Sequence, residues 1–519
     1  MPIYFLPLLA PALLLFPAAF CFLNAGRRPK LIPKFAEAAA LLALGVALLS
    51  AAGLVVFGPV VSPVTGFQGA GLSSRLDAVS VVMLLLVSFI GWVVVRYART
   101  YLDGEARQGG FTGWLCLTLA SVLFLVTSGN LFQLVAAWIA TSLFLHRLLL
   151  FYPDRVAARR AARKKFVTAR LGDVALTGAA LLLAAAYRTA DIGLILHAAR
   201  AGEGGSLAVG AASLLALAAM LKSAQFPMHG WLTEVMETPT PVSALLHAGV
   251  INAGGFLLIR FADVMLLAPG VLAVLVIVGG FTALFGSLVM LTQPAVKTSL
   301  AWSTVAQMGF MIFECGLALF PLALLHIVAH SLYKAHSFLA SGGAVERIAA
   351  MRRPGLVAIP NGRSVAWAFF SALAIYVLVG LAFGLTHKSP QAIALGAILI
   401  FGVAYMLAQG FADAAPRALT YRTAIYAIAT SIGYFALQTA ATSLTRDVLP
   451  PTPAPGPLEW ALIVLAVLSF GLVAIVQAMF PLWAYHPAAA GLRVHLSNGF
   501  YANAVFNRIV GGWSARGAS

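Results

Sequence analysis

Long apolar stretches separated by short polar connections run through the whole chain. A helix of about 20 apolar residues can cross a bilayer, and the stretches that reach this length predict about fifteen spanning helices. Their predicted ranges are 3–23, 36–57, 77–97, 111–129, 131–151, 166–187, 206–226, 240–260, 268–290, 298–319, 321–343, 364–385, 391–411, 420–441 and 457–483. No connection is long enough for a soluble domain. The pattern predicts an all-α polytopic membrane protein of about 13–15 helices, with one membrane domain over residues 1–483 and a short cytoplasmic tail over 484–519.

Composition supports the same class of protein. Hydrophobic residues make up 61% of the chain and charged residues 9%, whereas soluble domains carry about 25% charged residues. The cysteines Cys21, Cys116 and Cys315 stand singly in apolar stretches, without the spacing of a zinc or iron–sulfur site. We therefore expect them to be small buried hydrophobes, and we expect neither a metal nor another cofactor in this chain.

The net charge of +17 orients the chain in the membrane. If the N-terminus lies outside, the connections that follow the odd-numbered helices all lie on one side, and they hold most of the 33 basic residues. One such cytoplasmic group comprises Arg155, Arg159, Arg160, Arg163, Lys164 and Lys165. The positive-inside rule then places the C-terminus in the cytoplasm. The basic excess can also contact anionic lipid, and we expect no nucleic-acid partner.

Prolines interrupt the helical pattern at one informative place. Lys222 precedes Pro227, and Pro239 and Pro241 open the next apolar stretch. Proline removes a backbone donor and disfavours helix just before it, so we expect a broken helix here. Broken backbone is tolerated in a membrane only inside protein or beside a water cavity, and transporters place such breaks next to the transported ion. The alternative is that these prolines mark an ordinary cytoplasmic loop.

Ionisable residues lie inside the apolar stretches. His326, His330 and Lys334 follow one another at intervals of four residues, which places them on a stripe about 80° wide along roughly 12 Å of helix. A lysine at mid-bilayer costs roughly 2.5–3.5 kcal/mol, so such groups usually face a protein interior or a water-filled path. Since histidine titrates near neutral pH, the stripe favours a proton relay over isolated structural histidines. Lys222, His247 and Lys297 are the other candidates for a proton or cation path.

Two further carboxylates bear on this path. Arg170 and Asp173 are close enough in one helix to form an ion pair. This pair either reduces the cost of burying the two charges or lets Asp173 modulate the charge on Lys222. Glu314 is isolated in its apolar stretch and has no obvious partner.

Several ordered motifs resemble one family. The motifs are Leu221-Lys222-Ser223-Ala224-Gln225-Phe226-Pro227 with Trp231-Leu232, Thr238 through Ala248, Arg170-Leu171-Gly172-Asp173, Lys297 with Ala301 through Gly309, and His326-x3-His330-x3-Lys334. Together they resemble antiporter-like membrane subunits, such as the L subunit of respiratory complex I and the large Mrp antiporter subunits, over about residues 70–345. The resemblance implies a proton-conducting module with two broken helices. It also implies that Lys222 is a central proton carrier and that the histidines line its path.

The chain departs from complex I L subunits at two points, which indicates which members of the family it resembles most. Complex I L subunits carry a glutamate after a tryptophan in the fifth helix, whereas Ile139 follows Trp138 here. The chain also stops soon after Asn503, so we expect no room for the L subunit's lateral helix and final anchor. Both features are similar to the membrane subunits of DabA–DabB inorganic-carbon transporters.

That resemblance implies a transporter subunit without enzyme activity of its own, in a bacterial inner membrane. The DabA-like partner would be a peripheral cytoplasmic protein with a zinc site similar to β-carbonic anhydrase. Cation influx through the membrane subunit would make CO2 hydration one-way and accumulate bicarbonate. Two alternatives remain: a subunit of a complex I-like, hydrogenase-type or Mrp assembly, or a membrane enzyme. The sequence leaves H+ and Na+ both open as coupling ion.

Overall fold

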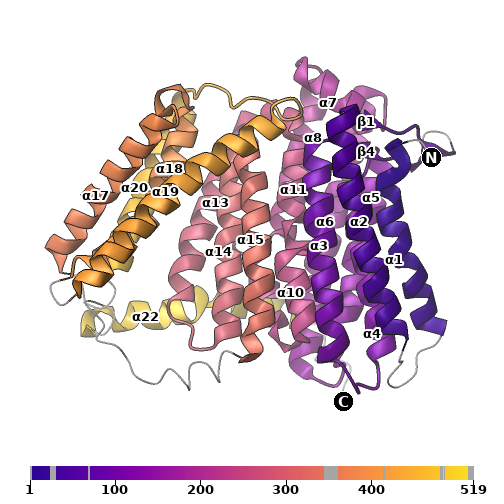
Figure 1. Ribbon diagram of the computed structural model, residues 1–519, viewed down its shortest axis with the longest axis horizontal. Coiled ribbons are helices and arrows are strands. Elements are labelled where there is room, and N and C mark those ends of the chain that lie inside the picture. The colour runs from indigo at the N-terminus through magenta and orange to yellow at the C-terminus, as the bar shows by residue number, and fades with distance from the viewer. Residues whose placement is uncertain are drawn as a thin grey trace.

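The computed structural model describes residues 3–23, 31–67, 70–343, 361–412, 415–479, 483 and 486–511. Upright helices lie side by side in a broad layer, with α17–α20 set apart from the rest (Figure 1). We call the end at which α22 and α23 lie the tail face and the opposite end, with the short strands, the strand face. These two faces are the ends of a membrane-spanning bundle.

Long helices make up the first half of the chain. They are α1 (Leu6–Leu23), α2 (Ile32–Phe57), α3 (Ala78–Tyr101), α4 (Gln108–Val126), α5 (Leu131–Leu149), α6 (Val156–Tyr187) and α8 (Gly205–Lys222). Short elements join them: η1 (Ile3–Phe5), the antiparallel pairs β1 (Val60–Val61) with β4 (Arg75–Leu76) and β2 (Thr65–Phe67) with β3 (Ala70–Leu72), and α7 (Ile192–Arg200). Asp77, Asn130 and Asp191 each accept a backbone N–H at the start of the helix that follows.

Shorter and interrupted helices follow in the middle of the chain. They are α9 (Gly230–Glu234), η2 (Val235–Glu237), α10 (Thr240–Ala248), η3 (Val250–Asn252), α11 (Ala253–Arg260) and α12 (Ala262–Leu266). Next come α13 (Pro269–Met290), α14 (Val296–Gly316), α15 (Phe320–Ala340) and η4 (Ser341–Gly343). The last part holds α17 (Gly362–Ala382), η5 (Leu385–His387), α18 (Pro390–Gly410), α19 (Arg417–Thr445), α20 (Pro457–Ala478), η6 (Pro487–Ala489), α22 (Ala490–Ser497), η7 (Gly499–Tyr501) and α23 (Ala502–Gly511).

The predicted class and number of helices are confirmed. Among the described residues, 13 helices are long and apolar enough to cross a membrane. Two more, α14 and α15, have 21 residues each but carry the polar side chains considered below. Both pack against neighbouring helices, and Glu314, His330 and Lys334 are buried, so these polar side chains meet protein instead of lipid.

One predicted boundary is wrong, and the error matters. The sixth helix was expected to begin at residue 166, because a run of basic residues precedes it. In the structure α6 begins at Val156, and Lys164 and Lys165 lie buried within it rather than in a cytoplasmic connection. Helices α5, α8 and α9 cover this part of α6. Hydropathy places a helix end at the first charges, whereas tertiary packing decides whether they are exposed.

The buried side chains form one large core and two smaller ones. The large core runs through α1–α15, a second holds α17–α20 together, and a third lies between the two groups of helices. In the large core, the backbones of α13 and α14 approach each other closely. A Cβ on Gly309 would lie 2.5 Å from the backbone N of Ala283, and one on Gly279 would lie 2.5 Å from the N of Phe313. Glycine therefore lets these two backbones touch, as small residues do between membrane helices.

The tail passes beneath the large core on the tail face (Figure 1). Helix α22 lies across the ends of the upright helices, and α23 packs against α6 and α9. Asn503 accepts a 2.7 Å hydrogen bond from Lys164 and donates another of 2.7 Å to Glu234. Lys164 Nζ is also 2.6 Å from Glu234 Oε1. The tail thus contains two short helices, and the second, α23, closes over the charges of Lys164 and Glu234.

Replacing Gly309 tests the close packing of α13 against α14. Gly309→Val should lower the thermal stability of the protein in detergent, because overpacking of this kind costs about 1–3 kcal/mol. Gly45→Val is the matched control, since a Cβ on Gly45 meets nothing within 4 Å. Equal melting temperatures for the two variants would contradict the close approach of α13 and α14.

Candidate functional site: a buried polar route

Two helix breaks face each other inside the large core. Helix α8 ends at Lys222, and residues 223–229 are non-helical before α9 begins. The second break lies at Gly249–Asn252, between α10 and α11. Ser223 Oγ, from the first break, donates a 3.1 Å hydrogen bond to the Ile251 carbonyl in the second. The broken helix predicted near the prolines is present, and a second break pairs with it.

Side chains satisfy the backbone that the breaks release. Asn252 Nδ2 donates to the Ala248 carbonyl at 3.0 Å and to Ser331 Oγ at 2.8 Å. The backbone N–H of Phe226 donates to Thr282 Oγ1 at 3.1 Å. Since unpaired backbone is very costly in an apolar interior, these contacts fix where each break can lie.

Glu314 and His326 form the end of a polar route nearest the strand face. His326 Nδ1 lies 2.9 Å from Glu314 Oε2. The expectation that Glu314 has no partner is therefore wrong. Glu314 lies two residues before the end of α14 and His326 six residues after the start of α15, and a helical hairpin can bring such positions on its two helices together. That spacing was available in the sequence.

The histidines continue the route towards the tail face. The rings of His326 and His330 are 6.0 Å apart between centroids. His330 Nε2 donates to the His247 carbonyl at 3.2 Å, and His247 Nδ1 lies 3.0 Å from Thr304 Oγ1. The route therefore crosses from α15 to the broken helix α10–α11 and on to α14.

Two lysines complete the route. Lys334 is fully buried, and its Nζ donates to the Leu300 carbonyl at 3.0 Å and to Ser303 Oγ at 2.8 Å. Lys297 is half-buried near the tail face and donates to Thr240 Oγ1 at 3.3 Å. The structure thus aligns Glu314, His326, His330, His247, Lys334 and Lys297, which we call the polar route.

Lys222, Arg170, Asp173 and Lys165 form a second group, the α6–α8 cluster. Arg170 Nη2 lies 2.5 Å from Asp173 Oδ2, so the two sequence neighbours do pair. Lys222 Nζ lies 4.4 Å above the Trp138 ring and has no hydrogen-bond partner among the described residues. Asp173 reaches Lys222 through its charge, without a direct ion pair. Its roles as structural partner and as modulator of Lys222 both remain predictions.

Sequence reasoning missed Lys165 as a member of this cluster. Lys165 Nζ donates to the Ser142 carbonyl at 2.6 Å and to Ser142 Oγ at 3.2 Å. Ala158 and Ala161 precede it at helical spacing and are buried too. A buried stripe of small residues running into the basic run was the available signal.

Two buried ionisable sites lie at the ends of the broken helices. Arg260 Nη1 and Arg75 Nε each lie 2.6 Å from Asp77 Oδ2. Burial alone would raise the pKa of Asp77, but the two guanidinium groups hold that pKa below its usual range. This ion pair anchors the end of α11 to the start of α3. His229 is packed between Phe226 and Trp302, and burial, with the nearby charge of Lys164, lowers its pKa to about 4. It is therefore neutral at physiological pH.

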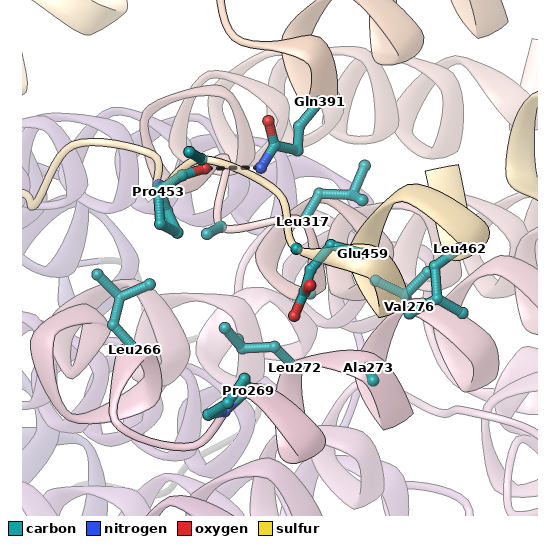
Figure 2. Close-up of a pocket in the computed structure, with 14 residues that line it drawn as sticks. Leu266, Pro269, Leu272, Ala273, Val276, Leu317, Gln391, Pro453, Glu459 and Leu462 are labelled. Atoms are coloured by element: carbon teal, nitrogen blue, oxygen red, sulfur yellow. Dashed lines mark hydrogen bonds between the residues drawn. The ribbon is translucent and has the colours of Figure 1, made fainter. Parts of the chain in front are cut away.

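One of two cavities meets the polar route, at the end nearest the strand face. A cavity of about 360 Å³ lies between α14, α15, α18 and α19, and Glu314, His326 and His330 line it. Another, of about 230 Å³, lies on the strand face between the large core and α20 (Figure 2). There Gln391 donates a 2.8 Å hydrogen bond to the Pro453 carbonyl, and the Glu459 side chain projects among apolar residues. No residue of the polar route lines this second cavity.

Metal binding finds no support in the geometry. The described part of the chain contains no group of three or more histidine, cysteine, aspartate or glutamate side chains placed to hold an ion. His326 and Glu314 meet as a pair only. The arrangement is suited to holding and passing protons, because imidazole, carboxyl and amine groups follow one another within a buried path.

Comparisons with known proteins agree with the fold. Residues 128–360 match the family described as "NADH:quinone oxidoreductase/Mrp antiporter, TM", and residues 66–112 match "NADH-Ubiquinone oxidoreductase (complex I), chain 5 N-terminus". The structure is similar to a chain of the Mrp complex from Dietzia sp., with a TM-score of 0.62 and 24% identity over 98% of this chain and 60% of that one. At this identity the likeness shows the fold alone.

Curated relatives are closer in sequence. "Probable inorganic carbon transporter subunit DabB" of Hydrogenovibrio crunogenus is 44% identical over 66% of this chain and 65% of its own length, just under two thirds. "Probable inorganic carbon transporter subunit DabB2" of Halothiobacillus neapolitanus is 37% identical over 84% of this chain and 80% of its own length. With this identity over most of both chains, and with the paired helix breaks in place, the protein belongs to the DabB family of antiporter-like membrane subunits.

Proposed function

We propose that this chain is the ion-conducting membrane subunit of an inorganic-carbon transporter. The observation that carries the proposal is the polar route, which links Glu314 near the strand face to Lys297 near the tail face inside apolar helices. Family membership supports the carbon-transport role, since the relatives' names state it. By the positive-inside pattern, the tail face is cytoplasmic and the N-terminus lies outside. The membrane we propose is the bacterial inner membrane.

The coupling ion we propose is H+. Nitrogen atoms of histidine and lysine make up most of the route, whereas alkali and other hard cations prefer oxygen ligands. A proton that enters from the 360 Å³ cavity reaches Glu314 and His326 first. His330 and His247 follow, and Lys334 then holds the charge before Lys297 releases it at the tail face.

Movement along the route is stepwise. The histidines and Lys334 are within reach of one another's charge, and two like charges at such distances are costly when little water screens them. One bound proton therefore disfavours a second on its neighbour, and each group passes its proton on before it accepts the next. The buried hydroxyls of Thr304 and Ser303 contact His247 and Lys334 and can bridge the transfer.

A DabA-like cytoplasmic partner would supply the carbon chemistry. This partner would bind zinc at a site similar to β-carbonic anhydrase and hydrate CO2, while the membrane subunit itself would catalyse no reaction. The exposed basic side chains near the start of α6, Arg159, Arg160 and Arg163, together with α22 and α23, are the surface we assign to partner contact. Proton influx through the route would then make hydration one-way and accumulate bicarbonate.

Two lysine substitutions test the path. Lys334→Met, on the polar route, should reduce inorganic-carbon uptake by about 100-fold, because a positioned proton-transfer group contributes at least that factor. Lys222→Met tests separately the sequence prediction that Lys222, in the α6–α8 cluster, is also a proton carrier. Uptake of labelled bicarbonate by a carbon-uptake-deficient strain measures the effect, and partner co-purification shows that the complex still assembles. Lys388→Met, in the loop before α18, removes the same group at a position that is not part of the polar route and should retain uptake. Normal uptake by Lys334→Met would rule out the polar route as the proton path.

Energy coupling is tested with the partner present. Cells that co-express this chain and its partner should accumulate bicarbonate, and an uncoupler should abolish the accumulation because the proton gradient drives it. Cells with this chain alone should accumulate none. Uptake that persists after both the proton and the sodium gradients are collapsed would contradict the mechanism. Co-purification of redox or cation-antiport subunits in place of a zinc protein would favour the complex I-like or Mrp alternative.

A further inference from the structure

A small cavity lies inside the α6–α8 cluster, apart from the polar route. It measures about 20 Å³, and its lining includes Lys165, Lys222, Thr168, Ser142 and Trp231. This volume holds about one water molecule or one ion of similar size. The side chains come from α5, α6, α8 and α9, so the cavity lies where the first helix break meets its neighbours.

Unpartnered donors line this cavity. Lys222 Nζ, Trp231 Nε1 and Thr168 Oγ1 are each buried without a hydrogen-bond partner. The exposed fractions of Lys222, Trp231 and Thr168 are 9%, 4% and 2%. Lys165 uses two of its three N–H groups on Ser142 and keeps one. A buried group that can donate but does not is unfavourable, so several of them around one cavity indicate a common acceptor.

The charges around the cavity are also out of balance. Lys165 and Lys222 are both buried, and each acts on the other electrostatically. The carboxylate that acts on both is Asp173, and Arg170 already neutralises it through a direct ion pair. When both amines carry a proton, the cluster holds two buried ammonium groups, and the carboxylate beside them is already paired with Arg170.

We propose that this cavity binds a small monovalent inorganic anion of the size of chloride, held between Lys165 and Lys222. Such an ion accepts hydrogen bonds and donates none, which matches a lining of unused donors. It also supplies the missing negative charge. Trp231 and Thr168 complete the set of donors, and the small volume excludes organic carboxylates. The binding site rests on this geometry alone and does not depend on what the complex transports.

Bromide binding to the purified protein tests the site. Bromide has chloride's chemistry and quenches tryptophan fluorescence, and both Trp231 in the lining and Trp138 beneath Lys222 are close reporters. We expect quenching with a saturable component when bromide replaces gluconate at constant ionic strength. Chloride should compete with it. The chain has 9 tryptophans, and those other than Trp138 and Trp231 add only a linear collisional background.

Variants separate this site from accidental binding. Lys165→Met should raise the bromide concentration at half-saturation by about tenfold or more, since a charged donor is lost. Trp138→Phe should reduce the amplitude of the saturable component with little change in its midpoint. Lys388→Met should leave both unchanged. If Lys165→Met does not fold, Thr168→Val removes one donor at nearly constant volume and should also weaken binding. Quenching that is purely linear, or a midpoint unaffected by Lys165→Met and Thr168→Val, would overturn the proposal.

Discussion

The rest of the structure depends on one requirement: backbone released by a broken helix in an apolar interior must find hydrogen bonds. Helices α8 and α10–α11 meet it by placing their breaks against each other, with Ser223 bonded to the Ile251 carbonyl. Asn252 and His330 satisfy further groups of the second break. Because these hydrogen bonds need particular side chains at particular positions along the helices, they also set where Lys222 and His247 lie. The positions of the candidate proton carriers therefore follow from the hydrogen bonds that satisfy the broken backbone.

Buried charge is the second constraint, and the structure treats it differently in different places. Asp77 with Arg260 is a compensated pair that joins the end of α11 to the start of α3, and Asp173 is paired with Arg170 within α6. Lys334 has neutral oxygen partners instead, so it can exist in either protonation state without leaving a carboxylate unpaired. The pair that braces α11 and α3 is therefore made of opposite charges, whereas Lys334, which is assigned to transport, has no opposite charge among its hydrogen-bond partners. This difference supports the division between structural and conducting residues.

Hydrophobic periodicity predicted many of the helices and of the buried polar side chains, and the predictions that failed did so for physical reasons. The stripe of His326, His330 and Lys334 follows from local helix geometry, so the sequence alone was sufficient. Glu314 was misjudged because its partner is contributed by the next helix, although the short turn between the two made the pairing accessible. Lys165 was misplaced because hydropathy cannot tell a solvated basic run from one covered by neighbouring helices. The docking of Asn503 beneath Lys164 joins residues far apart in the chain, and no local pattern encodes it.

The central claim is that protons cross this chain along the polar route. Its most direct test is proton flux into proteoliposomes that contain the complex purified from its own host, with a pH-sensitive dye inside and the membrane potential clamped by potassium and valinomycin. Under an inward proton gradient, the account predicts acidification of the interior in the parent and none in His330→Phe, which removes the link from His326 to His247. The same rate of acidification in both would contradict it.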